Sequence, residues 1–569
     1  MKYTFSIDAP QQQYIAITFT FSVTEKETEV CLPTWRPGRY QVGDFAKNIK
    51  TFQVFDDQGK KCTFHKTEKS KWLIDTANTK SVKIVYKYYA NQMNAGSTFL
   101  DQEQLYVNPV NCCLYVPLLM DEKAEVELNI PKHWKYAGPL EMENNNLTAV
   151  SFDELADSPF ICSAGLQHQS YKVNDVTFHV WFNGIIKPDW DKLIPDFEAF
   201  TAKQLEKFIE FPTDEYHFLF QILPYKAYHG VEHERCTVIT LGPSYAVFKS
   251  FYKELLGVSS HELYHTWNVK AIRPKEMYPY DFSKENYTHL GYITEGVTTY
   301  QGDLMLLKSG VFSLEQYLNE FNVQLQKHFD NFGRFNYSVA ESSFDTWLDG
   351  YEAGAPGRKV SIYTEGCLLA FVVDVLIMKA SDNSKSLDDV MRNLYFNFAQ
   401  KQQGITKEDF QNTIENCAGR VSFDWLFDQY YYGTKAYEII LTDCLEYLGL
   451  ELNHAPSDDA AAAYLGLKTQ EIDQKTIVQA IYPGSPSDLA GVTVGDEVIA
   501  LNDVSINSDL PAWTNYFENE LKSISVLRMG RLITFSIPQM DRPFYQKYWV
   551  TVVDQSDKSQ QNALKAWMK

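Results

Sequence analysis

The sequence predicts a multidomain α+β protein, in which an N-terminal all-β domain precedes a mixed β and helical domain and a small C-terminal β-rich domain. The 569 residues are too many for one core and suggest three or more domains. The apolar pattern changes along the chain from strand-like alternation to helical spacing and back. A hydrophobic share of 45%, with 15% aromatic residues, is enough to form ordered cores throughout.

The domain boundaries follow these changes of pattern. Residues 1–165 alternate in bursts such as "YIAITFTFSV" and "VKIVYKYYA", separated by turn signals such as "DDQGK" and "TWRPGRY", which predicts an all-β domain. Residues 166–446 combine strands with helices and become mainly helical, as in "SLEQYLNEFNVQLQKHF" behind its serine cap. Residues 449–540 return to short strands and Gly-rich turns, and residues 541–569 form a polar tail with a weak helical pattern.

The net charge and the hydropathy of the chain argue against nucleic acid and membrane as partners. A net charge of -21 disfavours binding to nucleic acid or to an anionic membrane, because both require a basic surface. The most apolar helical run, Cys367–Ala380, contains Asp374 and is shorter than the roughly 18 to 20 residues of a transmembrane helix. We therefore expect a buried core helix and no transmembrane segment.

The spacing of the cysteines and the N-terminal residues indicate the cellular compartment in which the protein is expected. The nine cysteines contain no CxxC pair and are scattered along the chain, which favours a reducing compartment over a disulfide framework. The start "MKYTFSIDAP" lacks the apolar core of about 7 to 15 residues of a signal peptide. We expect a cytoplasmic protein, or a periplasmic or secreted one if a leader has been removed.

The stretch "SSHELYHTWNVKAIRP" predicts a metal site. In a helix, His261 and His265 lie one turn apart on one face with Glu262 beside them, an arrangement that lets two imidazoles hold zinc and a glutamate act as general base. The alternative is a chance HExxH on an amphipathic helix, which about one or two per cent of chains this long would show. A metzincin is excluded, because Ala271 stands where a third histidine is required.

A third ligand is predicted in "GYITEGVTTYQGDLMLLKSG", where Glu295 lies on a segment with helical spacing that closes at Gly310. Glu276 and Glu285 lack this helical context. Asp303, two turns further along, is predicted to orient a ligand imidazole, with an ordinary surface aspartate as the alternative. Three protein ligands leave a fourth position for water, so the pattern predicts metal-assisted hydrolysis.

These motifs resemble those of the glycyl aminopeptidase family, gluzincin metallopeptidases that are distant relatives of aminopeptidase N and carry a C-terminal PDZ domain. The zinc helix resembles "SHELYHTWNVKAIRP", the third-ligand helix "TEGVTTYQGDL", and the N-terminal domain "LPTWRPGRYQVGDFAKNIKTFQVFDDQGK". The resemblance covers most of the chain. It implies a thermolysin-like catalytic domain over residues 166–446, one Zn²⁺ per chain, and peptide substrates with a free N-terminal glycine or alanine. Further residues match the family pattern without an assigned role: Trp267, Asn268, Lys270 and Arg273.

Two further stretches gain a role from the resemblance. "HGVEHE", with His229 in place of a glycine, is similar to a substrate-binding run in which Gly230 and Glu232 would contact substrate and Glu232 would pair with the α-amino group. An exposed acidic turn is the alternative, and a metal bound by His229 and His233 is disfavoured because they span about 13 Å on a strand. In "VSIYTEGCLLAF", Tyr363 matches the family's oxyanion tyrosine, with a packing tyrosine as the alternative.

Near Tyr363, Glu365 stands where many relatives have lysine, which changes the expected local charge. At the C-terminal end, the segment Ile481–Asp503 resembles a PDZ domain, and "YLGLK" places Leu465, Gly466 and Leu467 in a loop that would cap a peptide's terminal carboxylate. Packing on the catalytic domain is the alternative. The predicted function is a zinc aminopeptidase, and the alternatives are a zinc endopeptidase or a PDZ scaffold with a degenerate peptidase domain.

Overall fold

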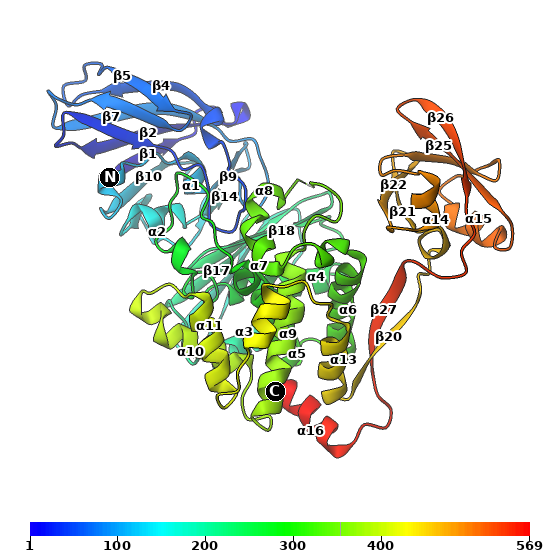
Figure 1. The fold of residues 1–569 in the computed structure, drawn as a ribbon. Helices are drawn as coiled ribbons and strands as arrows, with labels where there is room; N and C mark the ends of the chain where they lie inside the picture. Colours follow the sequence, from blue (N-terminus) through cyan, green and yellow to red (C-terminus); the bar gives the residue numbers. More distant parts are fainter. Residues whose placement is uncertain (353) are drawn as a thin grey trace.

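A computed structural model describes residues 1–352 and 354–569 (Figure 1). The predicted multidomain α+β class is confirmed. Figure 1 shows the N-terminal β domain at the upper left, the mixed domain in the centre and the small C-terminal domain on the right. Among the described residues, none of the helices combines the length and the hydrophobicity that crossing a membrane requires.

The N-terminal domain is built from sheets whose strands alternate buried and exposed residues. Strand β2 (Tyr14–Ser22) pairs with β7 (Ser81–Tyr89), and every second side chain of each points into one core. These two strands belong to a seven-stranded sheet. Its remaining strands, in sheet order, are β12 (Met142–Glu143), β13 (Asn146–Ala149), β10 (Ala124–Asn129) and β1 (Lys2–Ser6) before β2, and β4 (Ile49–Phe55) after β7.

Two smaller sheets complete this domain. A three-stranded sheet contains β3 (Glu27–Cys31), β6 (Lys71–Asp75) and β5 (Phe64–Glu68). A four-stranded sheet contains β11 (Lys135–Ala137), β14 (Phe160–Ser163), β9 (Gln104–Val107) and β8 (Phe99–Leu100). Side chains of the four-stranded sheet, such as Tyr106 and Ile161, share a hydrophobic cluster with Leu219 and Val238 of the mixed domain. The loop after β3 extends toward the mixed domain, where Tyr40 reaches Glu295.

The mixed domain starts with a five-stranded sheet. Its strands, in sheet order, are β15 (Gln167–Val173), β16 (Val176–Gly184), β17 (Glu215–Ile222), β19 (Cys236–Gly242) and β18 (Ala227–Glu232). Phe178, Val180 and Phe182 of β16 point into the core beneath helix α3 (Trp190–Phe208), so His179 and Trp181 point to the opposite face. Strand β18 lies at the sheet edge, antiparallel to β19.

Four helices of this domain surround the candidate site. They are α4 (Tyr252–Tyr264), α5 (Thr298–Lys308), α6 (Leu314–Asp330) and α9 (Ile362–Ala380). Helix α9 contains the predicted core run, and most of its side chains are buried. A short π-helical turn, Tyr292–Val297, leads directly into α5, and such wide turns are frequent at functional sites.

The C-terminal domain is held between two paired strands, β20 (Leu450–Pro456) and β27 (Gln546–Val552). Figure 1 shows this ribbon linking the domain to the central body. The sheet of the domain runs β21 (Leu467–Ile472), β22 (Lys475–Ile481), β23 (Glu497–Leu501), β25 (Lys522–Arg528) and β26 (Arg531–Ile537).

The polar tail, which has only a weak helical pattern in the sequence, forms a helix that packs against the mixed domain. Its helix α16 (Lys558–Trp567) returns to the mixed domain, where Trp567 is 2% exposed and donates from Nε1 to the hydroxyl of Tyr300 at 2.8 Å. Ala563 is buried as well, and Leu564 and Ala566 pack against the same core, so the helix docks through a small apolar face.

Candidate functional site

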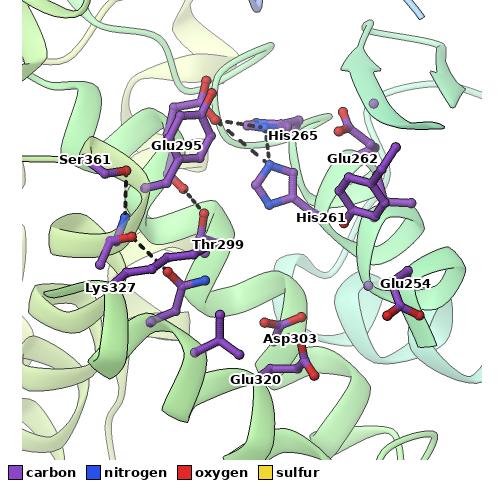
Figure 2. A pocket seen from close by; sticks show the side chains of 18 of the residues that line it. Glu254, His261, Glu262, His265, Glu295, Thr299, Asp303, Glu320, Lys327 and Ser361 are labelled. Carbon is purple, nitrogen blue, oxygen red and sulfur yellow. Dashed lines mark hydrogen bonds and ion pairs between the residues drawn. The ribbon is translucent and has the colours of Figure 1, made fainter. Parts of the chain in front are cut away.

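Two imidazoles and one carboxylate meet where α4 faces the turn before α5. His261 Nε2 and His265 Nε2 are 3.0 Å apart, and Glu295 Oε2 lies 3.5 Å from His265 Nε2 and 4.0 Å from His261 Nε2. Figure 2 shows the three side chains pointing toward one another. Tetrahedral ligands about 2.1 Å from zinc lie about 3.4 Å from each other. The structure brings the three predicted ligands together at spacings that fit one zinc ion.

The backbone after α4 orients His265. Its Nδ1 donates to the carbonyl of Asn268 at 2.8 Å, which leaves Nε2 facing the cluster. The Asn268 amide donates in turn to the Ile293 carbonyl at 2.8 Å and to Thr298 at 3.0 Å. Asn268 matched the family pattern without a role, and these contacts provide one. The group that orients His265 is this carbonyl and not Asp303, which Figure 2 shows beside Glu320, away from Glu295.

The N-terminal domain contributes a residue that the sequence analysis missed. Tyr40 donates its hydroxyl to Glu295 Oε1 at 2.8 Å, so the other carboxylate oxygen faces the two imidazoles. Burial, followed by the charge of Glu295, raises the pKa of Tyr40 and keeps the phenol protonated as a donor. The motif "TWRPGRY" supplied a turn signal and a family resemblance, but neither indicates which distant residue the tyrosine contacts.

Glu262 points into the same cavity. It is 5% exposed, and its Oε2 has no hydrogen-bond partner within the described part of the chain. Burial raises the pKa of Glu262 to about 8. Gly230 of the edge strand β18 packs against Glu262 so closely that a Cβ atom there would collide with Oε1. A glycine at this position therefore lets the strand edge approach the carboxylate.

Glu232 ends strand β18 and is 5% exposed. Its carboxylate packs against Gly38 of the N-terminal domain, where φ is +74° and a side chain would collide with the carboxylate. Ligand atoms of Glu232, Glu262 and His265 lie within 4.8 Å of one another. Glu232 therefore adds a second acidic group beside the imidazoles, at the junction of the two domains.

Tyr363 is the second residue of α9 and is 36% exposed, at the border of the cavity. The neighbouring Glu365, at the position where the resemblance leads one to expect lysine, is hydrogen-bonded by a buried histidine. His328 Nδ1 donates to both Glu365 oxygens at 2.8 and 2.9 Å, and Arg334 Nη1 donates to His328 Nε2 at 3.3 Å. The Glu365 carboxylate thus has its hydrogen-bond partner in the core behind Tyr363.

One cavity of 710 Å³ unites the predicted residues. It runs from Gly38 and Glu232, past the imidazoles, to Glu254, Asp303 and Glu320. The predicted site residues that line it are Gly230, Glu232, His261, Glu262, His265, Glu295, Asp303 and Tyr363. Such a cavity can hold a short peptide, with polar groups positioned to fix its orientation.

Comparisons with known proteins agree along the chain. The model of the Peptidase M61 N-terminal domain matches residues 2–164, that of the M61 glycyl aminopeptidase matches residues 254–369, and a PDZ domain model matches residues 477–528. The chain belongs to the M61 peptidase family. As an M61 peptidase, it is a zinc metallopeptidase of the aminopeptidase type.

One solved structure shares the fold of this chain over its full length. The crystal structure of an aminopeptidase N family protein from Idiomarina loihiensis is 24% identical and aligns over 100% of both chains with a TM-score of 0.91. An M1 zinc metallopeptidase from Deinococcus radiodurans is 11% identical, covers 76% of this chain and 94% of its own, and has a TM-score of 0.47. A search of curated proteins finds no match.

The M61 N-terminal domain is fastened to the catalytic domain by a buried ionic clasp. Asp157, which follows helix α2 (Phe152–Ala156), accepts from Lys270 Nζ at 2.9 Å and lies 3.1 Å from His233 Nδ1. It also accepts from the backbone N–H of Glu234 at 2.8 Å. Arg273 stacks on Tyr280 at 3.8 Å and donates to the Lys270 carbonyl. Asp157 thus contacts the two residues that follow Glu232, namely the side chain of His233 and the backbone of Glu234. These contacts fix the position of the end of β18.

Lys270→Met is expected to lower the free energy of unfolding by about 3 kcal/mol, because Asp157 would keep a buried charge without its ammonium partner. Thermal and urea unfolding measure this loss. The control is Lys123→Met, since the Lys123–Glu125 pair is exposed and should contribute at most about 0.5 kcal/mol. Equal effects of the two substitutions would contradict the clasp.

The PDZ loop of the M61 peptidase lies apart from the cavity. Gly466 has a φ of +70° and follows a short π-helical turn, Ala461–Leu465. Leu465 borders a second, smaller cavity of 230 Å³ together with Thr514 and Arg542. Beside this loop, Lys468 forms an ion pair with Asp330 at the end of α6. The predicted carboxylate loop therefore adjoins both a cavity and a contact with the catalytic domain.

Proposed function

We propose that this M61 peptidase removes N-terminal glycine or alanine from peptides, with one zinc ion per chain held by His261, His265 and Glu295. The observation that carries the proposal is the convergence of two imidazoles and a carboxylate, at 3.0 to 4.0 Å from one another, beside the buried Glu232 and Glu262. Zinc supplies a Lewis acid that polarises the scissile carbonyl and acidifies water.

The remaining steps belong to residues of the chain. Glu262, next to the imidazoles, takes a proton from the attacking water and delivers it to the leaving nitrogen. Glu232 pairs with the substrate ammonium, and Gly230 lets the strand edge lie close enough for this register. Tyr363 donates its hydroxyl to the oxyanion that forms only in the transition state.

The preference for small first residues is supported by the N-terminal domain. Gly38 packs directly on Glu232, and Tyr40 donates a hydrogen bond to Glu295. The loop that carries Gly38 and Tyr40 therefore limits, from one side, the space between Glu232 and the proposed metal ligands. A large first side chain would have to displace this loop.

Tyr363→Phe is expected to reduce kcat about 10²-fold with little change in KM, because only the oxyanion contact is lost. Steady-state kinetics on glycyl p-nitroanilide measures the split between kcat and KM. Tyr228→Phe serves as the control, since Tyr228 lines the same cavity and has no assigned contact with the substrate. A loss confined to KM would instead assign Tyr363 to ground-state binding.

The proposal is tested with one peptide in two forms. An aminopeptidase should cut Gly-Ala-Ala with a free amine and leave the N-acetylated peptide intact, whereas an endopeptidase should cut both. We also propose that the PDZ loop Leu465, Gly466 and Leu467 binds a peptide's C-terminal carboxylate through backbone N–H groups. Fluorescence anisotropy of a labelled peptide with a free or amidated C-terminus tests this second binding site.

A further inference from the structure

A second group of histidines and a glutamate lies on the face of the five-stranded sheet that packs, through Leu219, against the four-stranded sheet of the N-terminal domain. In the parallel pairing of β16 with β17, His179 is opposite His217. Glu215 precedes His217 by two residues and therefore shares its face of the strand. The strand register alone thus brings two imidazoles and a carboxylate together, outside the residues that line the 710 Å³ cavity.

The spacing of these groups suits a shared ion better than direct hydrogen bonds. Glu215 Oε2 is 3.8 Å from His179 Nε2, and Glu215 Oε1 is 3.7 Å from His217 Nε2. Both distances exceed the usual hydrogen-bond range of about 2.7 to 3.2 Å, and both are near the roughly 3.4 Å between tetrahedral zinc ligands. The donor set of two imidazoles and one glutamate equals that of the proposed catalytic centre.

The burial and the hydrogen bonds of the two histidines favour a bound ion at this position. His217 is 6% exposed, and within residues 1–352 and 354–569 its Nε2 finds no hydrogen-bond partner, which is costly for a buried polar atom. His179 Nδ1 lies 3.0 Å from His168 Nε2, so His168 can accept the Nδ1 proton and leave Nε2 free.

Two hydrogen bonds to these side chains determine which atoms are free to bind an ion and which bond must break when it binds. Arg235 Nη2 donates to Glu215 Oε1 at 3.2 Å, which leaves Oε2 for an ion. Trp181 Nε1 donates to His217 Nδ1 at 3.2 Å. Because an indole N–H can only donate, His217 accepts this bond at Nδ1 and carries its proton on Nε2. Coordination through Nε2 must move this proton to Nδ1 and end the Trp181 bond, with no net proton release.

We propose that His179, Glu215 and His217 form a second zinc site, in which His168 orients His179. The site would tie β16 to β17, and it is independent of the proposed substrate and catalytic roles. Zinc is the expected ion because the donor set combines two imidazoles with one carboxylate. Trp181 acts as a built-in reporter, since its hydrogen bond to His217 ends when the ion binds.

The test is zinc titration of the metal-depleted full chain, followed by a chromophoric zinc chelator, by elemental analysis and by tryptophan fluorescence. We expect two zinc ions per chain in the wild type, a fluorescence change with the second, and a rise in Tm. His179→Ala and the isosteric Glu215→Gln should each weaken the second site about tenfold or more and keep the first. His133→Ala, an exposed histidine elsewhere, is the matched control and should keep both.

Two results would overturn the proposal. One is a wild type whose only zinc is the ion lost on His265→Ala. The other is a second zinc that binds His179→Ala and Glu215→Gln as tightly as the wild type, which would show adventitious surface binding only. If His179→Ala does not fold, Glu215→Gln and Trp181 fluorescence decide the question.

Discussion

Glu262→Gln is expected to lower kcat on glycyl p-nitroanilide about 10³-fold, because an amide of the same shape cannot accept a proton from water. The carboxylate is buried beside the two imidazoles, and its Oε2 has no hydrogen-bond partner in the part of the chain that the structure describes. Its removal should therefore leave the fold intact. Kinetics, zinc content and Tm of the variant measure the three consequences separately.

The matched control for this change is Glu254→Gln. Glu254 lines the same cavity about two turns before His261 on α4, and it has no proposed role in proton transfer. Its kcat should stay close to that of the wild type. A Glu262→Gln variant that keeps zinc and most of its activity would show that the proton is taken by another group.

Glu232→Gln is expected to reduce kcat/KM about 10²-fold to 10³-fold for substrates with a free N-terminal amine, because the ammonium would lose its buried carboxylate partner. The residue is 5% exposed and packs against Gly38, so little water can replace the contact. The same substitution should not reduce the already low rate on the N-acetylated substrate. The ratio of the two rates, measured on both enzymes, is the diagnostic quantity.

Glu234→Gln is the control for Glu232. Glu234 lies two residues further along and meets Asp157 through its backbone N–H, so its side chain should not affect the ratio. Loss of activity on free and acetylated substrates alike would indicate that Glu232 supports the fold of β18 and does not select chain termini.

Local sequence patterns predict a large part of this molecule. The alternation in β2 and β7 and the helical spacing in α9 can each be recognised within a single strand or helix. The side-chain period of that element determines which of its faces is buried. The proposed metal ligands His261 and His265 are likewise one helical turn apart, and the third proposed ligand, Glu295, lies on a later helical segment. The fold class and the peptidase family are accordingly confirmed, whereas the ligand roles stay predictions.

Contacts between distant segments could not be predicted in this way. Tyr40 meets Glu295 across 255 residues, and Asp157 meets Lys270 across 113, so no local period records either pair. The docking of Trp567 was missed for the same reason, since its partner Tyr300 lies 267 residues away along the chain. Asn268 orients His265 through its backbone carbonyl. Because every residue has a backbone carbonyl, the residue type at this position does not indicate that role.

The most direct test of the central claim combines zinc analysis with activity on the wild type and on His265→Ala. The account predicts a wild type that releases glycine from the unblocked glycyl anilide only when zinc is present, and a variant that loses both the catalytic zinc and the activity. A metal-free wild type that stays inactive after zinc is added, or a His265→Ala variant that keeps full activity, would contradict it.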